Sequence, residues 1–185
     1  MSDKKKRLRL AMQKKQRELT EQQKEQAGQD LVERIACMDF WKKSQNIGCY
    51  IAHKNELRTQ KLMDLAWSQG KCVYVPVVEK SSRAMRFVRY QESDELEKGA
   101  YGIEQPRGAD DGEDGSMECD CFIVPACGLD EKGYRLGMGK GYYDDFLKKH
   151  GRIACAFVAV AYRCNRVISI GPESHDMPCA IKIWV

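Results

Sequence analysis

Residues 135–147 read RLGMGKGYYDDFL and combine bare backbone, a lysine and two carboxylates in a short span. Three glycines at alternate positions remove Cβ atoms, permit positive φ angles and let backbone N–H groups approach an anion closely. The helix that we expect to begin near Tyr142 would add the positive end of its dipole, and Lys140 adds a full charge. The spacing therefore predicts a phosphate-binding turn built from Gly137, Gly139 and Gly141.

Two carboxylates, Asp144 and Asp145, follow in the first turn of that expected helix. Beside a polyphosphate a carboxylate is repelled unless a cation lies between them, and Mg²⁺ binds one or two carboxylates together with phosphate oxygens. The stretch thus favours a nucleoside triphosphate with Mg²⁺. It matches neither the Walker A pattern nor GxGxxG, so a tight strand–helix turn with capping aspartates stays open as the alternative.

The composition fits a single globular domain. The chain has 185 residues, 43% of them hydrophobic and 31% charged, which is enough for one well-solvated core. A membrane helix needs about 18 apolar residues, whereas the apolar run at 153–162 is much shorter and is typical of a buried strand. Because no apolar stretch follows the N-terminal lysines, we predict no secretory signal and a cytoplasmic location.

Cysteine and histidine spacing gives no support for a zinc site. The nine cysteines include no CxxC pair, which indicates a reduced cytosolic protein that uses cysteine as a small hydrophobic residue. The three histidines are scattered, without the spacing of metal ligands. We expect His53 and His150 at the surface or in loops, and His175 in a turn.

Charge is concentrated in two segments of opposite sign. Residues 1–17 are strongly basic, whereas residues 109–121 carry acids and no base. A basic end can bind nucleic acid, a membrane surface or phosphates. An RNA-binding module would interleave aromatic residues with the basic ones, and residues 1–17 contain none.

Hydrophobic periodicity alternates between helices and buried strands. The expected helices cover 4–19, 20–43 with a Thr20–Gln23 capping box, 59–67 with Thr59 as N-cap, and the segment from 142 onward. The expected strands cover 46–52, 71–78, a half-exposed 85–90, 121–126, 153–161 and an edge strand at 180–185, and 108–118 forms a loop. This order predicts an α/β protein, residues 1–185 forming a single three-layer α/β/α domain with a mixed, mostly parallel sheet. Ligands bind beyond the carboxyl ends of such strands, where the glycine-rich stretch is expected.

The segment RLGMGKGYYD, preceded by VPACGLDEKGY, closely resembles the signature of the 5-formyltetrahydrofolate cyclo-ligase (methenyltetrahydrofolate synthetase) family. Further segments resemble that family in the same order along most of the chain. KRLRL resembles its basic N-terminal helix, and IGCYIAHKNELRT its first strand and glutamate loop. YGIEQP resembles the segment before its variable loop, and HDMP at 175–178 its C-terminal acidic motif.

The resemblance implies an ATP- and Mg²⁺-dependent ligase acting on small molecules. It would convert 5-formyltetrahydrofolate to 5,10-methenyltetrahydrofolate and release ADP and phosphate. The formyl oxygen would attack the γ-phosphate, and N10 of the folate would trap the resulting iminium phosphate. This route makes chemical sense because phosphorylation turns a poor leaving group into a good one, so the protein mainly positions groups and neutralises charge.

The family's nucleotide and metal residues carry over by position. The resemblance implies that Lys5 and Arg9, on one face of the N-terminal helix, bind ATP, that Lys140 and Tyr142 are catalytic, and that Asp144 and Asp176 hold Mg²⁺ while Asp145 lies at the surface. The other implied ATP contacts are Arg135, Leu136, Gly137, Met138, Gly139, Lys140, Gly141, Tyr142 and Tyr143. The structural alternatives are a solvated basic helix face for Lys5 and Arg9, dipole compensation for Asp144 and a turn role for Asp176.

The implied folate contacts come from separate parts of the sequence. Glu56 would accept hydrogen bonds from the amino and ring N–H groups of the pterin, which suit a carboxylate. Tyr142 would stack near the reacting formyl group, with a buried aromatic residue whose hydroxyl is satisfied as the alternative. Ile51, which would otherwise be plain core, Tyr101, Met138 and Arg9 complete the implied set.

One departure from the family pattern and two other functional interpretations stand beside this prediction. The C-terminal motif often carries a second aspartate where this chain has Ala180. A related α/β sheet could instead serve a sugar-phosphate or CoA-ester enzyme, and the basic N-terminus could mark a non-catalytic RNA-binding module. The cyclo-ligase interpretation expects a monomer without nucleic-acid or membrane partners.

Overall fold

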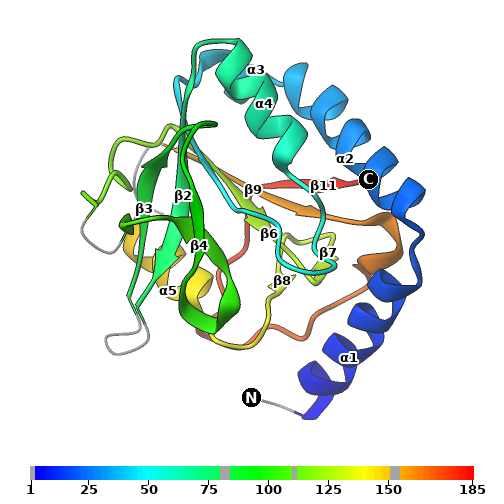
Figure 1. The fold of residues 1–185 in the computed structure, drawn as a ribbon. Coiled ribbons are helices and arrows are strands. Elements are labelled where there is room, and N and C mark those ends of the chain that lie inside the picture. Colours follow the sequence, from blue (N-terminus) through cyan, green and yellow to red (C-terminus); the bar gives the residue numbers. More distant parts are fainter. Residues whose placement is uncertain (1–2, 80–83, 110–111, 151–154) are drawn as a thin grey trace.

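A computed structural model of the chain describes residues 3–79, 84–109, 112–150 and 155–185. Its centre is a six-stranded sheet in the order β11-β9-β6-β1-β2-β3 (Figure 1). Neighbouring strands pair in parallel from β11 to β2, and only β3 runs antiparallel to its neighbour. The strands are β1 (Asn46–Cys49), β2 (Cys72–Val78), β3 (Met85–Tyr90), β6 (Cys121–Pro125), β9 (Ala156–Ala161) and β11 (Ile181–Trp184).

Helices cover both faces of this sheet, which confirms the predicted α/β/α layering. One face packs against α2 (Glu21–Ala36), α3 (Asp39–Lys43) and α4 (Gln60–Ser68), and the other against α5 (Tyr142–His150) (Figure 1). Leu31 and Ile35 of α2 are fully buried on the first face, and Phe146 of α5 packs against Phe122 and Phe157 on the second. Burial of these apolar faces stabilises the sheet from both sides.

The helix boundaries confirm some cap predictions and correct others. The Thr20–Gln23 capping box is present in both directions at the start of α2. The expected helix 20–43 is wrong in its continuity, because α2 ends at Ala36 and Met38 takes an extended conformation before α3. Thr59 occupies the N-cap position of α4, yet its hydroxyl donates to the Tyr50 carbonyl at 2.6 Å and does not cap the helix.

Several strand expectations also need correction. The first strand ends at Cys49, three residues before the expected boundary, because the chain turns into the loop that leads to α4. β3 is mostly buried, although its alternating sequence predicted a half-exposed strand. Residues 151–154, which include the start of the expected strand 153–161, lie outside the described residues. β11 is an edge strand, as predicted.

Two small sheets and two short 3-10 helices, one of them η3 (Arg163–Asn165), were not expected from the sequence. β7 (Gly128–Asp130), β8 (Arg135–Leu136) and β10 (Arg166–Val167) form one sheet, and β4 (Leu96–Lys98) pairs with β5 (Glu104–Pro106) as a hairpin whose tip is the 3-10 turn η1 (Ala100–Gly102). These additions lie around the carboxyl ends of the parallel strands (Figure 1).

The N-terminal helix α1 (Asp3–Glu18) docks beside this edge, close to the expected 4–19. Met12 is buried, and its carbonyl accepts a hydrogen bond from the Asn165 side chain at 3.2 Å. Lys15 donates to the Cys164 carbonyl at 3.1 Å. These contacts fix the basic helix on the domain, so that its first turns lie at the site described below.

All nine cysteines are free thiols, as the reduced-protein prediction requires. Cys49 and Cys121 are fully buried among apolar side chains and behave as small hydrophobic residues. Among the described residues, no helix combines the length and apolarity needed to cross a membrane.

Candidate active site

The glycine-rich turn follows β8 and leads directly into α5. The sequence predicted this turn between the buried strand at 121–126 and a helix, and the structure adds the β7–β8 hairpin between β6 and the turn. Gly139 and Gly141 have φ angles of +92° and +79°, a region that favours glycine. The Arg9 guanidinium donates from Nε to the Gly137 carbonyl at 2.7 Å, and a Cβ atom on Gly139 would lie 3.2 Å from Arg9 Cζ. The turn therefore needs glycine both for its conformation and for the close approach of Arg9.

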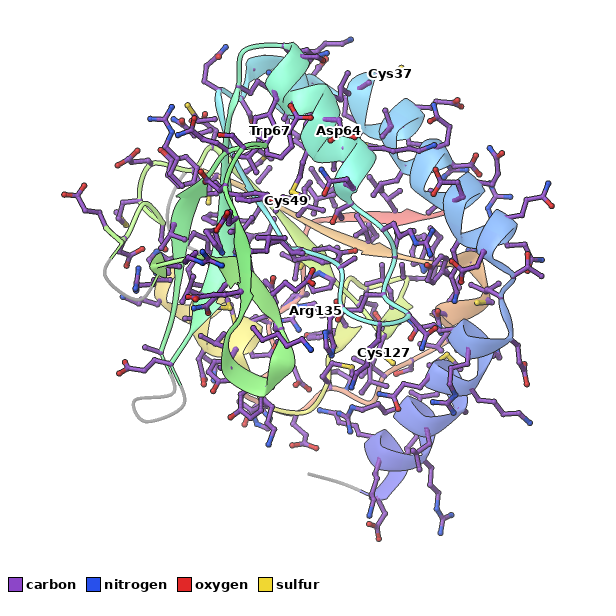
Figure 2. All side chains as sticks on the ribbon, in the orientation of Figure 1. Cys37, Cys49, Asp64, Trp67, Cys127 and Arg135 are labelled. Atoms are coloured by element: carbon purple, nitrogen blue, oxygen red, sulfur yellow. The ribbon has the colours of Figure 1, made fainter. Side chains whose placement is uncertain are left out.

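Arg135 and Asp144 close the base of this turn. The guanidinium is buried and pairs from Nη2 with Asp144 Oδ1 at 3.1 Å. It also lies over the Tyr143 ring, with Cζ 5.4 Å from the ring centroid. Figure 2 places Arg135 between the β4–β5 hairpin and α1, on the side of the sheet where the small additions gather. The pair fixes the start of α5 against β8.

Lys5 brings the C-terminal acidic motif to the same edge. Its buried ammonium pairs with Asp176 Oδ2 at 2.5 Å and lies 3.5 Å from Glu173 Oε1. Asp176 also accepts the Glu173 backbone N–H at 2.6 Å, so it shapes a turn as well as holding Lys5. The Lys5 ammonium is the reason that the pKa of Asp176 lies below its usual range despite burial. Lys5 and Arg9 thus share one helix face, as predicted.

The two predicted metal ligands lie near each other but do not form a complete metal cage. The Met177 backbone N–H donates to Asp144 Oδ1 at 3.5 Å, which brings Asp144 next to the segment that carries Asp176. Within the described parts of the chain, no cluster of three or more His, Cys, Asp or Glu side chains could hold a metal. Two carboxylates suit a Mg²⁺ ion that takes its other ligands from phosphate and water. The residues therefore fit a metal that is shared with a bound nucleotide.

Glu56 lies in the loop between β1 and α4, in a buried polar cluster. Its Oε2 accepts the His53 backbone N–H at 3.0 Å, and burial raises the pKa of the carboxyl group. The Tyr143 hydroxyl is buried and has no hydrogen-bond partner among the described residues, and burial next to Glu56 raises its pKa well above the usual value. Burial also raises the pKa of the Cys127 thiol to about 11, a shift that nearby Arg9 opposes. The cluster thus holds polar groups that a bound ligand could satisfy.

An aromatic pair borders the site on the other side. The Tyr101 and Tyr142 hydroxyls lie 3.2 Å apart, and the Lys140 ammonium lies 5.1 Å from the centroid of the Tyr101 ring. Tyr101 stands at the tip of the β4–β5 hairpin with a φ angle of +60°, which is rare for a bulky residue. The hairpin therefore places Tyr101 over the turn that carries Lys140 and Tyr142.

The remaining predicted residues lie at different depths. Leu136 is buried in β8, so its side chain is part of the core. Ile51 is half-buried two residues beyond β1, whereas Met138 is exposed and its Sδ lies 3.5 Å from the Gln13 amide. Asp145 is exposed, as expected. The structure thus brings the predicted residues to one edge of the sheet, and their roles there stay predictions.

Asp130 is a structural residue of this site that sequence reasoning missed. Its Oδ1 accepts the backbone N–H groups of Lys132 and Tyr134, each at 3.0 Å, and its Oδ2 accepts that of Ile170 at 3.0 Å. The carboxylate is fully buried and shapes the turn between β7 and β8. An aspartate shortly before a glycine, here Asp130 and Gly133, is typical of such a turn and could have predicted it from the sequence.

The surface prediction for His150 is wrong. His150 is buried at the end of α5 and stacks on Phe146 with ring centroids 4.3 Å apart. Neither ring nitrogen has a hydrogen-bond partner in the described ranges, and burial lowers its pKa. The residue fills the second core face because its helix places it one turn beyond Phe146.

The fold and the site together define an α/β domain with a glycine-rich turn near the carboxyl ends of its parallel strands. Comparisons with known proteins identify the family. The family model "5-formyltetrahydrofolate cyclo-ligase family" matches residues 1–183, and the chain therefore belongs to this family of ligases. This confirms the resemblance drawn from the sequence and favours it over the sugar-phosphate, CoA-ester and RNA-binding interpretations.

Individual relatives agree over nearly the whole chain. The 5-formyltetrahydrofolate cyclo-ligase of Haemophilus influenzae is 29% identical over 96% of this chain and 95% of its own. The solved structure of Aquifex aeolicus 5,10-methenyltetrahydrofolate synthetase has a TM-score of 0.80 and 28% identity over 97% of this chain and 89% of its own. That of the Mycoplasma pneumoniae 5,10-methenyltetrahydrofolate synthetase has a TM-score of 0.74 over 98% of both chains, and at 22% identity it supports the fold alone.

Proposed function

We propose that this protein converts 5-formyltetrahydrofolate to 5,10-methenyltetrahydrofolate and ATP to ADP and phosphate. Family membership supports the folate reaction. The observation that carries the ATP assignment is the glycine turn itself, which contains Lys140 and whose backbone, free of Cβ atoms at three positions, is approached by Arg9. Such a turn followed by a helix N-terminus is suited to phosphate groups.

In the proposed reaction the formyl oxygen attacks the γ-phosphate of ATP and displaces ADP. N10 then adds to the formyl carbon of the resulting iminium phosphate and closes the five-membered ring. Loss of the N10 proton to solvent and departure of phosphate give the methenyl product. Lys140 and Arg9 balance the charge of the transferring phosphoryl group, which is the main contribution that a protein can make to this chemistry. Tyr142 orients the formyl group beneath Tyr101.

Glu56 is the proposed anchor of the pterin ring. Its free carboxylate oxygen accepts the ring N–H and amino groups, while His53 N–H holds the other oxygen at 3.0 Å. The buried Tyr143 hydroxyl beside it gains a partner when the ligand fills the cluster. Ligand binding would therefore satisfy polar groups that have no partner among the described residues, which favours the bound state.

Asp144 and Asp176 are the proposed Mg²⁺ ligands. When bound, Mg²⁺ would neutralise phosphate charge and help to align the γ-phosphate. Arg135 and Lys5 hold the two carboxylates in the present arrangement. These ion pairs offset the negative charge of both carboxylates and so reduce their mutual repulsion at the proposed nucleotide site.

We also propose that the protein works in the cytoplasm, because nine free thiols are typical of a reducing compartment. A monomer remains the expectation, and size-exclusion chromatography with light scattering measures it directly.

The test of this function is the absorbance of methenyltetrahydrofolate formed from 5-formyltetrahydrofolate, ATP and Mg²⁺. We expect Lys140→Ala and Asp144→Asn each to lower kcat/KM by about 100-fold or more, as for the loss of one charge-stabilising group. Asp145→Asn is the matched control, since Asp145 is the exposed neighbour of Asp144, and it should retain activity. A wild-type protein without turnover, or an Asp144→Asn variant as active as the control, would refute the proposal.

A further inference from the structure

The loop that carries Glu56 has almost no regular secondary structure. Between the end of β1 and the start of α4 the chain is irregular, with a turn at Lys54 and Asn55 and a bend at Glu56. A carboxylate that recognises a ring must be held within a fraction of an ångström, and loops alone rarely provide this. Some neighbouring element must therefore fix the loop on both sides of Glu56.

One set of contacts comes from the sheet and its flanking residues. The Tyr162 hydroxyl donates to the Glu56 carbonyl at 3.1 Å, and the Tyr50 hydroxyl donates to the Leu57 carbonyl at 2.7 Å. These bonds hold the backbone at and after Glu56. They leave the side of the loop that precedes Glu56 to be held from elsewhere.

The first turns of α2 supply the second set of contacts. Lys24 Nζ donates to Asn55 Oδ1 at 3.1 Å and pairs with Glu21 Oε1 at 2.9 Å. Arg58 pairs with Glu21 and, at 3.4 Å, with Glu25 Oε2. Asn55 precedes Glu56 and Arg58 follows it, so α2 contacts the loop on both sides of the Glu56 carboxylate.

These contacts differ in how strongly they can act. The Arg58 pairs are solvent-exposed, and exposed ion pairs contribute little. Lys24 is different because its side chain is only 9% exposed, and a buried ammonium group must keep its partners. An apolar side chain would fill the same volume at no electrostatic cost, so packing alone does not explain a lysine here.

We propose that Lys24 is a positioning residue for folate recognition, which acts through Asn55 to hold the Glu56 loop against α2. The inference rests on the proposed function, since it takes Glu56 as the pterin anchor. Lys24 itself contacts neither the glycine turn nor the two aspartates in the contacts described for it, so its effect should be confined to the folate side of the reaction.

The test compares Lys24→Met with Lys61→Met. Both changes remove one lysine charge from the same surface network, but Lys61 pairs with Glu25 at 2.8 Å and does not contact the Glu56 loop in its described contacts. We expect Lys24→Met to raise KM for 5-formyltetrahydrofolate about tenfold, which is typical of the loss of one supporting contact. KM for ATP should stay within about twofold of the wild-type value. Lys61→Met should change neither value.

Asn55→Ala provides a second route that keeps the buried lysine. It should raise the folate KM to a similar extent, and the double variant should add little to either single change, because the two residues act as one unit. A folate KM that is unchanged in Lys24→Met, an equal rise in both KM values, or full additivity with Asn55→Ala would overturn the proposal.

Hydrogen exchange separates this inference from the proposed function. In the ligand-free protein, Lys24→Met should speed amide exchange in residues 53–57 about tenfold and leave α5 unchanged. This measurement needs no substrate, so it tests the positioning role of Lys24 even if the wild-type protein shows no turnover. If amide exchange in residues 53–57 is the same in Lys24→Met as in wild type, the positioning role of Lys24 is refuted, and the proposed enzymatic function is unaffected.

Discussion

Arg135 and Asp144 stand at the two ends of the glycine turn and are joined by an ion pair of 3.1 Å, with the arginine side chain only 2% exposed. The pair spans the segment that we propose to hold ATP, so the turn is closed at its base before any ligand binds. The part of the turn between them contains Gly139 and Gly141, whose positive φ angles favour glycine.

Removing Arg135 should therefore affect stability as well as activity. Arg135→Met leaves the Asp144 carboxylate without its cation, and we expect a loss of about 3 kcal/mol in the free energy of unfolding, as for a broken buried pair. Urea denaturation followed by circular dichroism measures it. Arg107→Met is the control, because the Arg107–Glu95 pair is exposed and should be worth less than about 1 kcal/mol. Equal losses in the two variants would contradict the assigned role of the buried pair.

Gly133 in the β7–β8 turn should tolerate no side chain. Its φ angle is +86°, and a Cβ atom would lie 2.1 Å from the Cys179 carbonyl oxygen, so the backbone would have to move. Gly70 has a φ angle of +70° and open space around it. We expect Gly70→Ala to cost about 1 kcal/mol for the left-handed conformation and Gly133→Ala to cost several times more, measured by thermal unfolding. If the two variants melt together, the contact with Cys179 is absent in solution.

His150 should make the protein sensitive to mild acid. Burial lowers its pKa in the folded state, so below a pH of about 6.5 the unfolded chain binds a proton that the folded chain resists. Stability is then fully present at neutral pH and falls as pH decreases, by at most about 1.4 kcal/mol per pH unit from this group. The fall stops once pH passes below the folded-state pKa.

The variant His150→Phe keeps the stacking on Phe146 and removes the titrating ring. Urea unfolding measures the stability of the two proteins at about pH 7.5 and about pH 5.5, which lie about one unit on either side of the ordinary histidine pKa. The variant should lose less stability between these conditions than wild type. An identical loss would mean that His150 gains protons as readily in the folded state as in the unfolded chain.

Tyr101 should be strained in the conformation that places it over Lys140 and Tyr142. A left-handed φ angle costs a residue with a Cβ atom about 1 kcal/mol, and glycine escapes this cost. We expect Tyr101→Gly to be more stable than Tyr101→Ala by up to that amount, although both should raise KM for the folate. Differential scanning calorimetry of the two variants gives the comparison. An alanine variant as stable as the glycine variant would show that the turn relaxes once the tyrosine ring is gone.

The sequence predicted the layers of the fold because its signals are local and strong. Apolar runs such as the one around Ile123 mark buried strands, and Thr20 with Gln23 marks a helix start, since each pattern reflects nearby residues. The glycine turn was predicted for the same reason. The three glycines and Lys140 lie within one short segment, and their chemistry does not depend on distant contacts.

The missed features depend on contacts between distant segments. Asp130 has a local turn pattern, but its bond to the Ile170 N–H joins the turn to a distant segment, and no spacing in the sequence predicts that bond. His150 is buried because α5 turns it against Phe146 and the sheet, which outweighs its polarity. Met38 takes an extended conformation and separates α2 from α3, although the sequence predicted one continuous helix. This break allows α3 to bury Trp41 in the core.

The Lys5–Asp176 contact joins residues 171 positions apart, and this separation has a consequence during synthesis. A ribosome that has made the first helix, and even the whole glycine turn, still has not made the partner that Lys5 requires. The growing polypeptide can pack its early strands as it emerges. The site that we propose for the nucleotide, however, can be completed only after Asp176 has been synthesised.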